Sequence, residues 1–101
     1  MSYRDMAEVK AANHRAGHHF FEAGTMRFFD SRIGRTIYGG RYFITSEQFH
    51  GSGGYSAPRE FTIREATPEG HVETVGSFNT YPTAAAARRE ITRLLREEHN
   101  L

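Results

Sequence analysis

The stretch from His19 to Phe49 constrains the fold most strongly, because it gathers the large aromatic side chains of the chain. About a third of the 101 residues hold six of the eight Phe and two of the five Tyr. Aromatic side chains bury large apolar areas and dominate the energetics of both cores and interfaces. We therefore expect this stretch to form the nucleus of the core and part of a contact surface. It carries no recognisable catalytic signature.

The composition is that of a globular domain, and it limits the classes of function. Hydrophobic residues make up 38% and charged residues 25% of the chain, and no apolar run approaches the roughly 20 residues that cross a bilayer. The polar N-terminus MSYRDMAEVK is unlike a secretory signal, and a chain without cysteine forms no disulfide or thiolate. We expect one domain over residues 1–101, located in the cytoplasm and without contact with a membrane. The net charge of +1 gives no overall field that would attract nucleic acid.

Two helices are predicted in the N-terminal third. Residues 3–16 combine early acidic residues with a weak apolar stripe, a pattern typical of a surface helix. Residues 24–34 place Met26, Phe29 and Ile33 on one helical face, with a threonine at the start and a glycine at the end. So short a helix needs to pack on a sheet, because its own propensity is insufficient.

The middle of the chain changes to a period of two, which indicates strands. Residues 36–38 and 41–47 flank Gly39-Gly40, a pair that supplies the positive φ angles of a tight hairpin turn. Residues 60–65 and 71–78 alternate in the same way and are joined by a proline-containing turn. Connections this short favour pairing between neighbours, and therefore a four-stranded meander.

The chain ends in its strongest helical pattern. Residues 84–98 follow Thr83, a favoured N-cap, and begin with four alanines, the residue of highest helix propensity. The predicted fold class is α+β in the order ααββββα. We expect a curved four-stranded antiparallel sheet with the N-terminal helices and the C-terminal helix packed on one face.

Neither the histidines nor the glycine-rich loop forms a recognisable catalytic or cofactor motif. His14 and His18 have the i, i+4 spacing of metal ligands, with His19 adjacent, but a zinc site needs three or four ligands and the others are not placed by the sequence. Whether these histidines bind a metal stays open. Residues 51–54 lack the Lys-Ser/Thr and the helix that follow a phosphate-binding loop. We expect no catalytic residue, no metal and no cofactor.

A contact surface for a protein partner is predicted instead. Its members are Arg27, Phe28 and Arg32 around the second helix, with Gly53 and Tyr55 in the glycine-rich loop. Phe28 falls off the apolar stripe of its helix, so it is either an exposed anchor of the kind enriched at interface hot spots or packed under the first helix.

The alternative is a nucleic-acid-binding sheet face. Arg41, Arg59 and Arg64 belong to the strand region, and on an uncovered face they would alternate with Tyr42 and Thr62. Such interleaving suits phosphate contacts and base stacking. The opposing interpretation is a solvated sheet face on which the strand glutamates neutralise the arginines. These glutamates are Glu47, Glu60, Glu65 and Glu73.

The sequence FFEAGTMRFFDSRIG, followed by YGGRYFITSEQF, resembles small proteins of unknown function from phages, plasmids and other mobile elements of bacteria. The likeness is carried by residues 25–32 and 42–49 and extends over roughly residues 19–95. It implies a compact accessory protein with no catalytic residues. Such chains include inhibitors of host defence, anti-CRISPR proteins among them, which occupy a surface of a host nucleoprotein complex.

The segment VGSFNTYPTAAAARREITRLL is similar to the sheet-plus-helix DNA-binding domains of phage integrases, and this implies a nucleic-acid partner. The leading hypothesis is a non-enzymatic inhibitor of a bacterial defence (CRISPR-Cas) complex that acts through protein contact. Nucleic-acid binding is the alternative, and a homodimer joined through a sheet edge is a third possibility.

Overall fold

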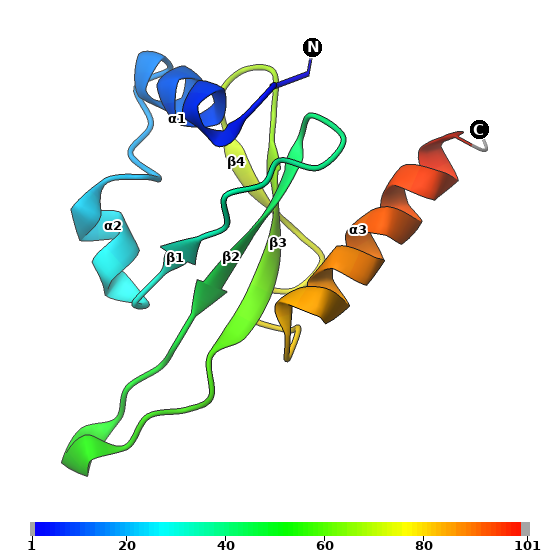
Figure 1. Cartoon of the computed structure of the whole chain (residues 1–101). Helices are drawn as coiled ribbons and strands as arrows, with labels where there is room; N and C mark the ends of the chain where they lie inside the picture. The colour runs from blue at the N-terminus through cyan, green and yellow to red at the C-terminus, as the bar shows by residue number, and fades with distance from the viewer. Residues whose placement is uncertain (1, 100–101) are drawn as a thin grey trace.

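Figure 1 shows the computed structural model of the chain, which describes residues 2–99 and confirms an α+β fold with a four-stranded antiparallel meander. The elements are, in chain order, α1 (Met6–Arg15), α2 (Ala23–Phe28), β1 (Arg32–Ile33), β2 (Tyr42–Glu47), β3 (Glu60–Ala66), β4 (Val72–Val75) and α3 (Ala84–His99). A short 3₁₀ turn at Ser52–Gly54 lies between β2 and β3. No helix in residues 2–99 is long and apolar enough to span a membrane.

The strands follow one another across the sheet in the order β1-β2-β3-β4. The predicted glycine turn before β2 is confirmed, since Gly39 and Gly40 have φ angles of 58° and 74°. Only glycine adopts such angles without steric cost. The predicted strand over residues 36–38 is wrong: only Tyr38 forms an isolated bridge, with Tyr42, and the first strand of the sheet is β1. The sheet is flat or only mildly curved, so the predicted curvature is stronger than the curvature observed.

The helices cover both faces of the sheet, so the prediction that they share one face is wrong. On one face, α3 packs its Ala87 and Ile91 with Ile44 and Ile63. On the other face, α1 packs against Phe43 and its neighbours, and α2 lies on the same side (Figure 1). Every residue of β2 is buried. Because successive side chains of a strand point to opposite faces, a strand buried along its whole length needs cover on both sides.

α2 is shorter than predicted, and this shift changes the role of the residues that follow it. The helix ends at Phe28, and Asp30 takes a positive φ of 49° that reverses the chain. Ile33 instead belongs to β1 and pairs with Thr45 of β2, so it does not share a helical face with Met26. The apolar residues do have helical spacing, but this segment forms its backbone hydrogen bonds as a two-residue edge strand next to β2.

The C-terminal half follows the prediction more closely. Thr83 caps α3, with its hydroxyl oxygen accepting a hydrogen bond of 3.0 Å from the backbone N–H of Ala86. β4 is shorter than residues 71–78, because Gly76 has a φ of 75° and ends the extended backbone. Phe78 and Asn79 therefore lie in the connection to α3 rather than in the sheet.

Candidate functional site

A buried carboxylate lies at the end of β2, on the same face of the sheet as Phe43. Glu47 is 0% exposed. Its Oε2 accepts hydrogen bonds from the hydroxyl of Thr45 at 2.6 Å and from the guanidinium of Arg64 at 3.3 Å. Its Oε1 accepts from the hydroxyl of Thr62 at 2.7 Å and from the amide of Asn79 at 3.3 Å. Four donors, one of which is the positively charged Arg64, compensate the cost of taking this carboxylate out of water.

Arg64 is held rigidly by the same network. Its Nε donates to the hydroxyl of Thr45 at 3.0 Å and its Nη1 to that of Thr74 at 2.6 Å. The guanidinium lies between two aromatic rings, 5.2 Å from the centroid of Phe20 and 5.4 Å from that of Phe78. Burial lowers the pKa of Arg64, and the neighbouring Glu47 opposes the shift. An arginine remains protonated under such conditions, so Arg64 and Glu47 form a buried ion pair of opposite charges.

Four phenylalanines from three segments of the chain meet beside Arg64, and we call them the phenylalanine cluster: Phe28, Phe29, Phe49 and Phe78. The ring of Phe29 lies at its centre, 4.6 Å from Phe28, 5.3 Å from Phe49 and 5.2 Å from Phe78 between centroids. The three outer members are exposed, Phe28 most of all at 79%. A contiguous exposed group of large apolar side chains on a small protein marks an interaction site.

A pocket of about 490 Å³ opens next to the phenylalanine cluster, and we call it the aromatic pocket. Phe20, Met26, Phe28 and Phe78 supply apolar walls, and Arg64 supplies the charged group in its lining. An apolar hollow rimmed by exposed aromatic side chains can accept an apolar side chain of a partner.

The predicted protein-contact residues are only partly brought together. Arg27 and Phe28 lie side by side at the exposed end of α2. Arg32 lies in β1 opposite Ser46. Cross-strand partners share a face, so Arg32 belongs with Ser46 to the face that α3 covers, across the sheet from Phe28.

Gly53 and Tyr55 lie apart from α2, at the tip of the arm that residues 48–59 form between β2 and β3 (Figure 1). Tyr55 is 64% exposed there. The base of this arm is the part that touches the end of α2, through Phe49 and through His50, whose Nε2 is 3.2 Å from the carboxylate of Asp30.

Asp30 also holds the part of the arm that leads back into β3. Its carboxylate and its carbonyl oxygen accept hydrogen bonds of 3.0 and 2.8 Å from the guanidinium of Arg59. The hydrogen bond with His50 is the main cause that lowers the pKa of Asp30, and Arg59 adds to the shift, while partial desolvation opposes it. The arm base and the phenylalanine cluster are thereby held next to each other.

The predicted basic sheet face of Arg41, Arg59 and Arg64 is not formed. Each of the three is paired with its own carboxylate: Arg41 with Glu98, Arg59 with Asp30, and Arg64 with Glu47. The prediction assumed that one sheet face was open. Because helices cover both faces, these three arginines are partly buried, and a carboxylate neutralises each of them.

Because one sheet face was assumed to be open, the polar network around Glu47 was not predicted. Thr62 and Arg64 were expected to face solvent, yet Thr62 is buried and Arg64 is enclosed between rings. Glu47 was considered only as a solvated counter-charge. The signal that could have identified it is its place at the end of a central strand, opposite hydroxyl-bearing residues. Asn79 carried a weaker signal, since asparagine is enriched at positive φ and its φ is 55°.

The histidines lie in two separate contacts. The ring of His18 stacks on that of His71 at 4.1 Å between centroids, and Nδ1 of His19 lies 2.7 Å from a carboxylate oxygen of Glu22. His14 is exposed in the last turn of α1. Within residues 2–99, no three His, Asp or Glu side chains gather closely enough to hold a metal ion.

Comparison with protein-family models gives a match over most of the chain. The chain belongs to a family of unknown function (DUF7447), whose model matches residues 5–92. This match runs from the start of α1 into α3, so it includes the phenylalanine cluster, the arm and the buried network. Neither the curated proteins nor the solved structures gave a match.

Proposed function

We propose that the chain is a non-enzymatic binding protein that docks a partner protein on the phenylalanine cluster and the aromatic pocket. The observation that carries this proposal is Phe28, which is 79% exposed at the rim of an apolar pocket. Arg64, which lines the same pocket, is held by hydrogen bonds to Thr45, Thr74 and Glu47. A preorganised surface with exposed aromatic anchors loses little conformational entropy when it binds.

The chemistry of the surface defines what the partner must offer. The guanidinium of Arg64 lines the pocket, and Arg27 is exposed beside Phe28 without an ion pair within residues 2–99. A matching segment has one apolar side chain for the pocket and an acidic residue next to it. The charge pair would set orientation and association rate, while the buried apolar group would supply most of the affinity.

The biological setting that we propose is a mobile element of bacteria. The short chain, the resemblance of residues 25–32 and 42–49 to mobile-element proteins and the family of unknown function support an accessory protein that acts in the cytoplasm. Its target would be a defence nucleoprotein complex of the CRISPR-Cas type, inhibited by occupation of a surface.

The test is capture of partners from a bacterial lysate on the tagged protein, with and without nuclease, read by mass spectrometry. We expect a defined protein set that survives nuclease and is lost with Phe28→Ala. Tyr55→Ala is the matched control, because it removes another exposed aromatic at the far tip of the arm. Once a partner is purified, Phe28→Ala should weaken its binding by about 2 kcal/mol, or roughly thirtyfold.

Three results would overturn the proposal. Phe28→Ala could lower only the melting temperature and leave capture intact. The captured proteins could disappear with nuclease, which would favour nucleic acid as the partner. Light scattering could show that the chain pairs with a second copy through Phe28, which would make the surface a homodimer interface.

A further inference from the structure

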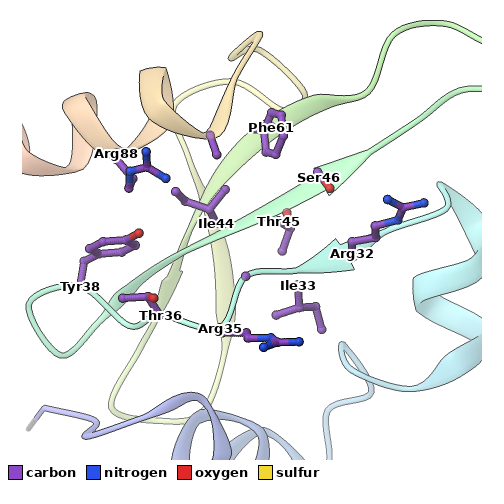
Figure 2. A pocket seen from close by; sticks show the side chains of 12 residues that line it. Arg32, Ile33, Arg35, Thr36, Tyr38, Ile44, Thr45, Ser46, Phe61 and Arg88 are labelled. Carbon is purple, nitrogen blue, oxygen red and sulfur yellow. The ribbon is translucent and has the colours of Figure 1, made fainter.

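A second pocket, of about 290 Å³, lies on the opposite face of the sheet, between the β1 edge and the first turns of α3. Figure 2 shows Arg32 beside β1 and Arg88 reaching from α3, while Arg35, which also lines the pocket, lies below the β1 ribbon beside Ile33. We call it the arginine pocket. Its lining also includes the aromatic residues Tyr38 and Phe61.

The arginine pocket carries an excess of positive charge, although Arg32 interacts electrostatically with the nearby carboxylate of Asp30. The three arginines are exposed, and none forms an ion pair within residues 2–99. No Asp or Glu is among the residues that line the pocket. This differs sharply from Arg41, Arg59 and Arg64, which all have carboxylate partners. Exposed guanidinium groups without an ion-pair partner are available to donate hydrogen bonds to the oxygen atoms of an anion.

The arrangement of the three groups favours an extended anion over a compact one. In Figure 2 the guanidinium groups are spread around the hollow and do not converge on one point. A single phosphate or carboxylate would therefore meet only one of them. A chain with a charge on every unit can meet several, and the rings of Tyr38 and Phe61, which pack against the core under α3, are partly exposed in the pocket lining for stacking. Proteins that bind single strands combine these two features.

We propose that the arginine pocket binds single-stranded nucleic acid, with Arg32, Arg35 and Arg88 on separate phosphates. This site lies across the sheet from the phenylalanine cluster and does not depend on the proposed protein contact. A protein with both surfaces can hold a partner protein and the strand that the partner carries. The modest net charge of +1 is compatible with the proposal, because the paired arginines elsewhere cancel while these three do not.

The test is fluorescence anisotropy of a labelled 12-nucleotide oligothymidylate over a range of salt concentrations. Arg32→Gln/Arg35→Gln/Arg88→Gln should lose at least tenfold in affinity at low salt. The slope of log K against log salt should fall in magnitude by about 2, since each phosphate contact on a single strand contributes about 0.7. Arg15→Gln/Arg89→Gln/Arg96→Gln is the matched control, with the same charge change on exposed arginines outside the pocket. It should lose no more than about threefold, an expectation that rests on screened, non-contacting charges.

Further arms identify the ligand. Thymidine monophosphate and inorganic phosphate should compete poorly, and so should a glutamate peptide of equal charge, which lacks bases to stack. Equal losses in the two triple variants, or equal competition by the glutamate peptide, would overturn the proposal, as would no binding by the unaltered chain. Should the triple variant unfold, Arg88→Gln alone, on the exposed side of α3, replaces it with an expected loss of about two- to fivefold. Phe28→Ala should leave oligothymidylate binding unchanged, so failure of one site is distinguishable from failure of the other.

Discussion

The two faces of the sheet bury their residues by different means. Under α3 the buried contact is apolar, with Ile44 and Ile63 of the sheet against Ala87 and Ile91 of the helix. Polar contacts with α3 occur near its C-terminal end, where Glu98 pairs with Arg41 and accepts a hydrogen bond from the hydroxyl of Tyr42. The opposite face is apolar only under α1. Towards α2 it changes to Thr45, Glu47, Thr62 and Arg64, joined by hydrogen bonds.

This difference indicates that the residues that mainly stabilise the fold and the residues that support the proposed binding surface lie on different faces of the sheet. An apolar face is sufficient to hold a helix, whereas a buried ion pair is a weak source of stability compared with apolar packing. Local rules of sequence are broken mainly at functional sites. The polar face lies under the phenylalanine cluster, and we infer that it is retained to hold Arg64 and Phe78 in place there.

Removing the buried carboxylate of Glu47 is expected to have the largest effect on the polar face of the sheet. Glu47→Ala should lower the free energy of unfolding by about 4 kcal/mol, because Arg64 would remain enclosed between two rings without a counter-charge. Urea unfolding followed by circular dichroism measures the change. Glu73→Ala removes a carboxylate from an exposed position of β4 and should change the stability by no more than about 0.5 kcal/mol. If the two variants were equally mild, the network would not hold the polar face together.

Removing an apolar group from the other face tests the second half of the comparison. Ile91 is 1% exposed, so Ile91→Ala leaves a cavity and should cost about 3 kcal/mol. Below the unfolding midpoint, the folded variant should bind the partner as well as the unaltered chain does. Phe28→Ala should show the reverse, with lost binding and a stability change below about 0.5 kcal/mol. Loss of partner affinity in folded Ile91→Ala would show that the two faces are coupled.

Asn79 gives a finer test of the polar face. Its amide donates to the carbonyl oxygens of Glu47 and Glu60 at 3.2 Å each, and its φ is 55°. Asn79→Gly keeps the backbone angle and loses the hydrogen bonds, at a cost of about 1 kcal/mol. Asn79→Ala also forces a left-handed backbone on alanine and should cost about 1 kcal/mol more. Equal destabilisation of the two variants would contradict a role for the backbone angle.

The elements that the sequence predicted are those with local signals. The Gly39-Gly40 turn, the Thr83 cap and the alanine-led helix each depend on residues a few positions apart, and all three are confirmed. The early end of α2 was not predicted, because the helical spacing of the apolar residues does not reveal the positive φ of Asp30 or the pairing of Ile33 with β2.

The candidate site was predictable only at Arg27 and Phe28, where an aromatic residue stands off its apolar stripe. The rest required tertiary structure. The phenylalanine cluster joins the end of α2 to Phe49 and Phe78, and the network joins Glu47 to Arg64 and Asn79. Strand periodicity cannot show that a second layer covers a face, so arginines that looked available are enclosed.

The smallest expected effect is a pH dependence at the base of the arm, beside the polar face. Hydrogen bonding by His50 lowers the pKa of Asp30 below its ordinary value of 3.8. A carboxyl with a lowered pKa stabilises the folded chain above 3.8, and this contribution disappears as the pH falls through its folded-state pKa. Asp30→Asn should therefore lower the melting temperature slightly at pH 6, and the difference should shrink by pH 3. Asparagine tolerates the positive φ of this position, so the backbone is undisturbed. Calorimetry against Glu69→Gln, which removes an exposed turn carboxylate, isolates the local contact. A difference that stayed constant with pH would show that the ion pair contributes nothing and that the apolar contact of Phe29 with Phe49 alone fixes the arm.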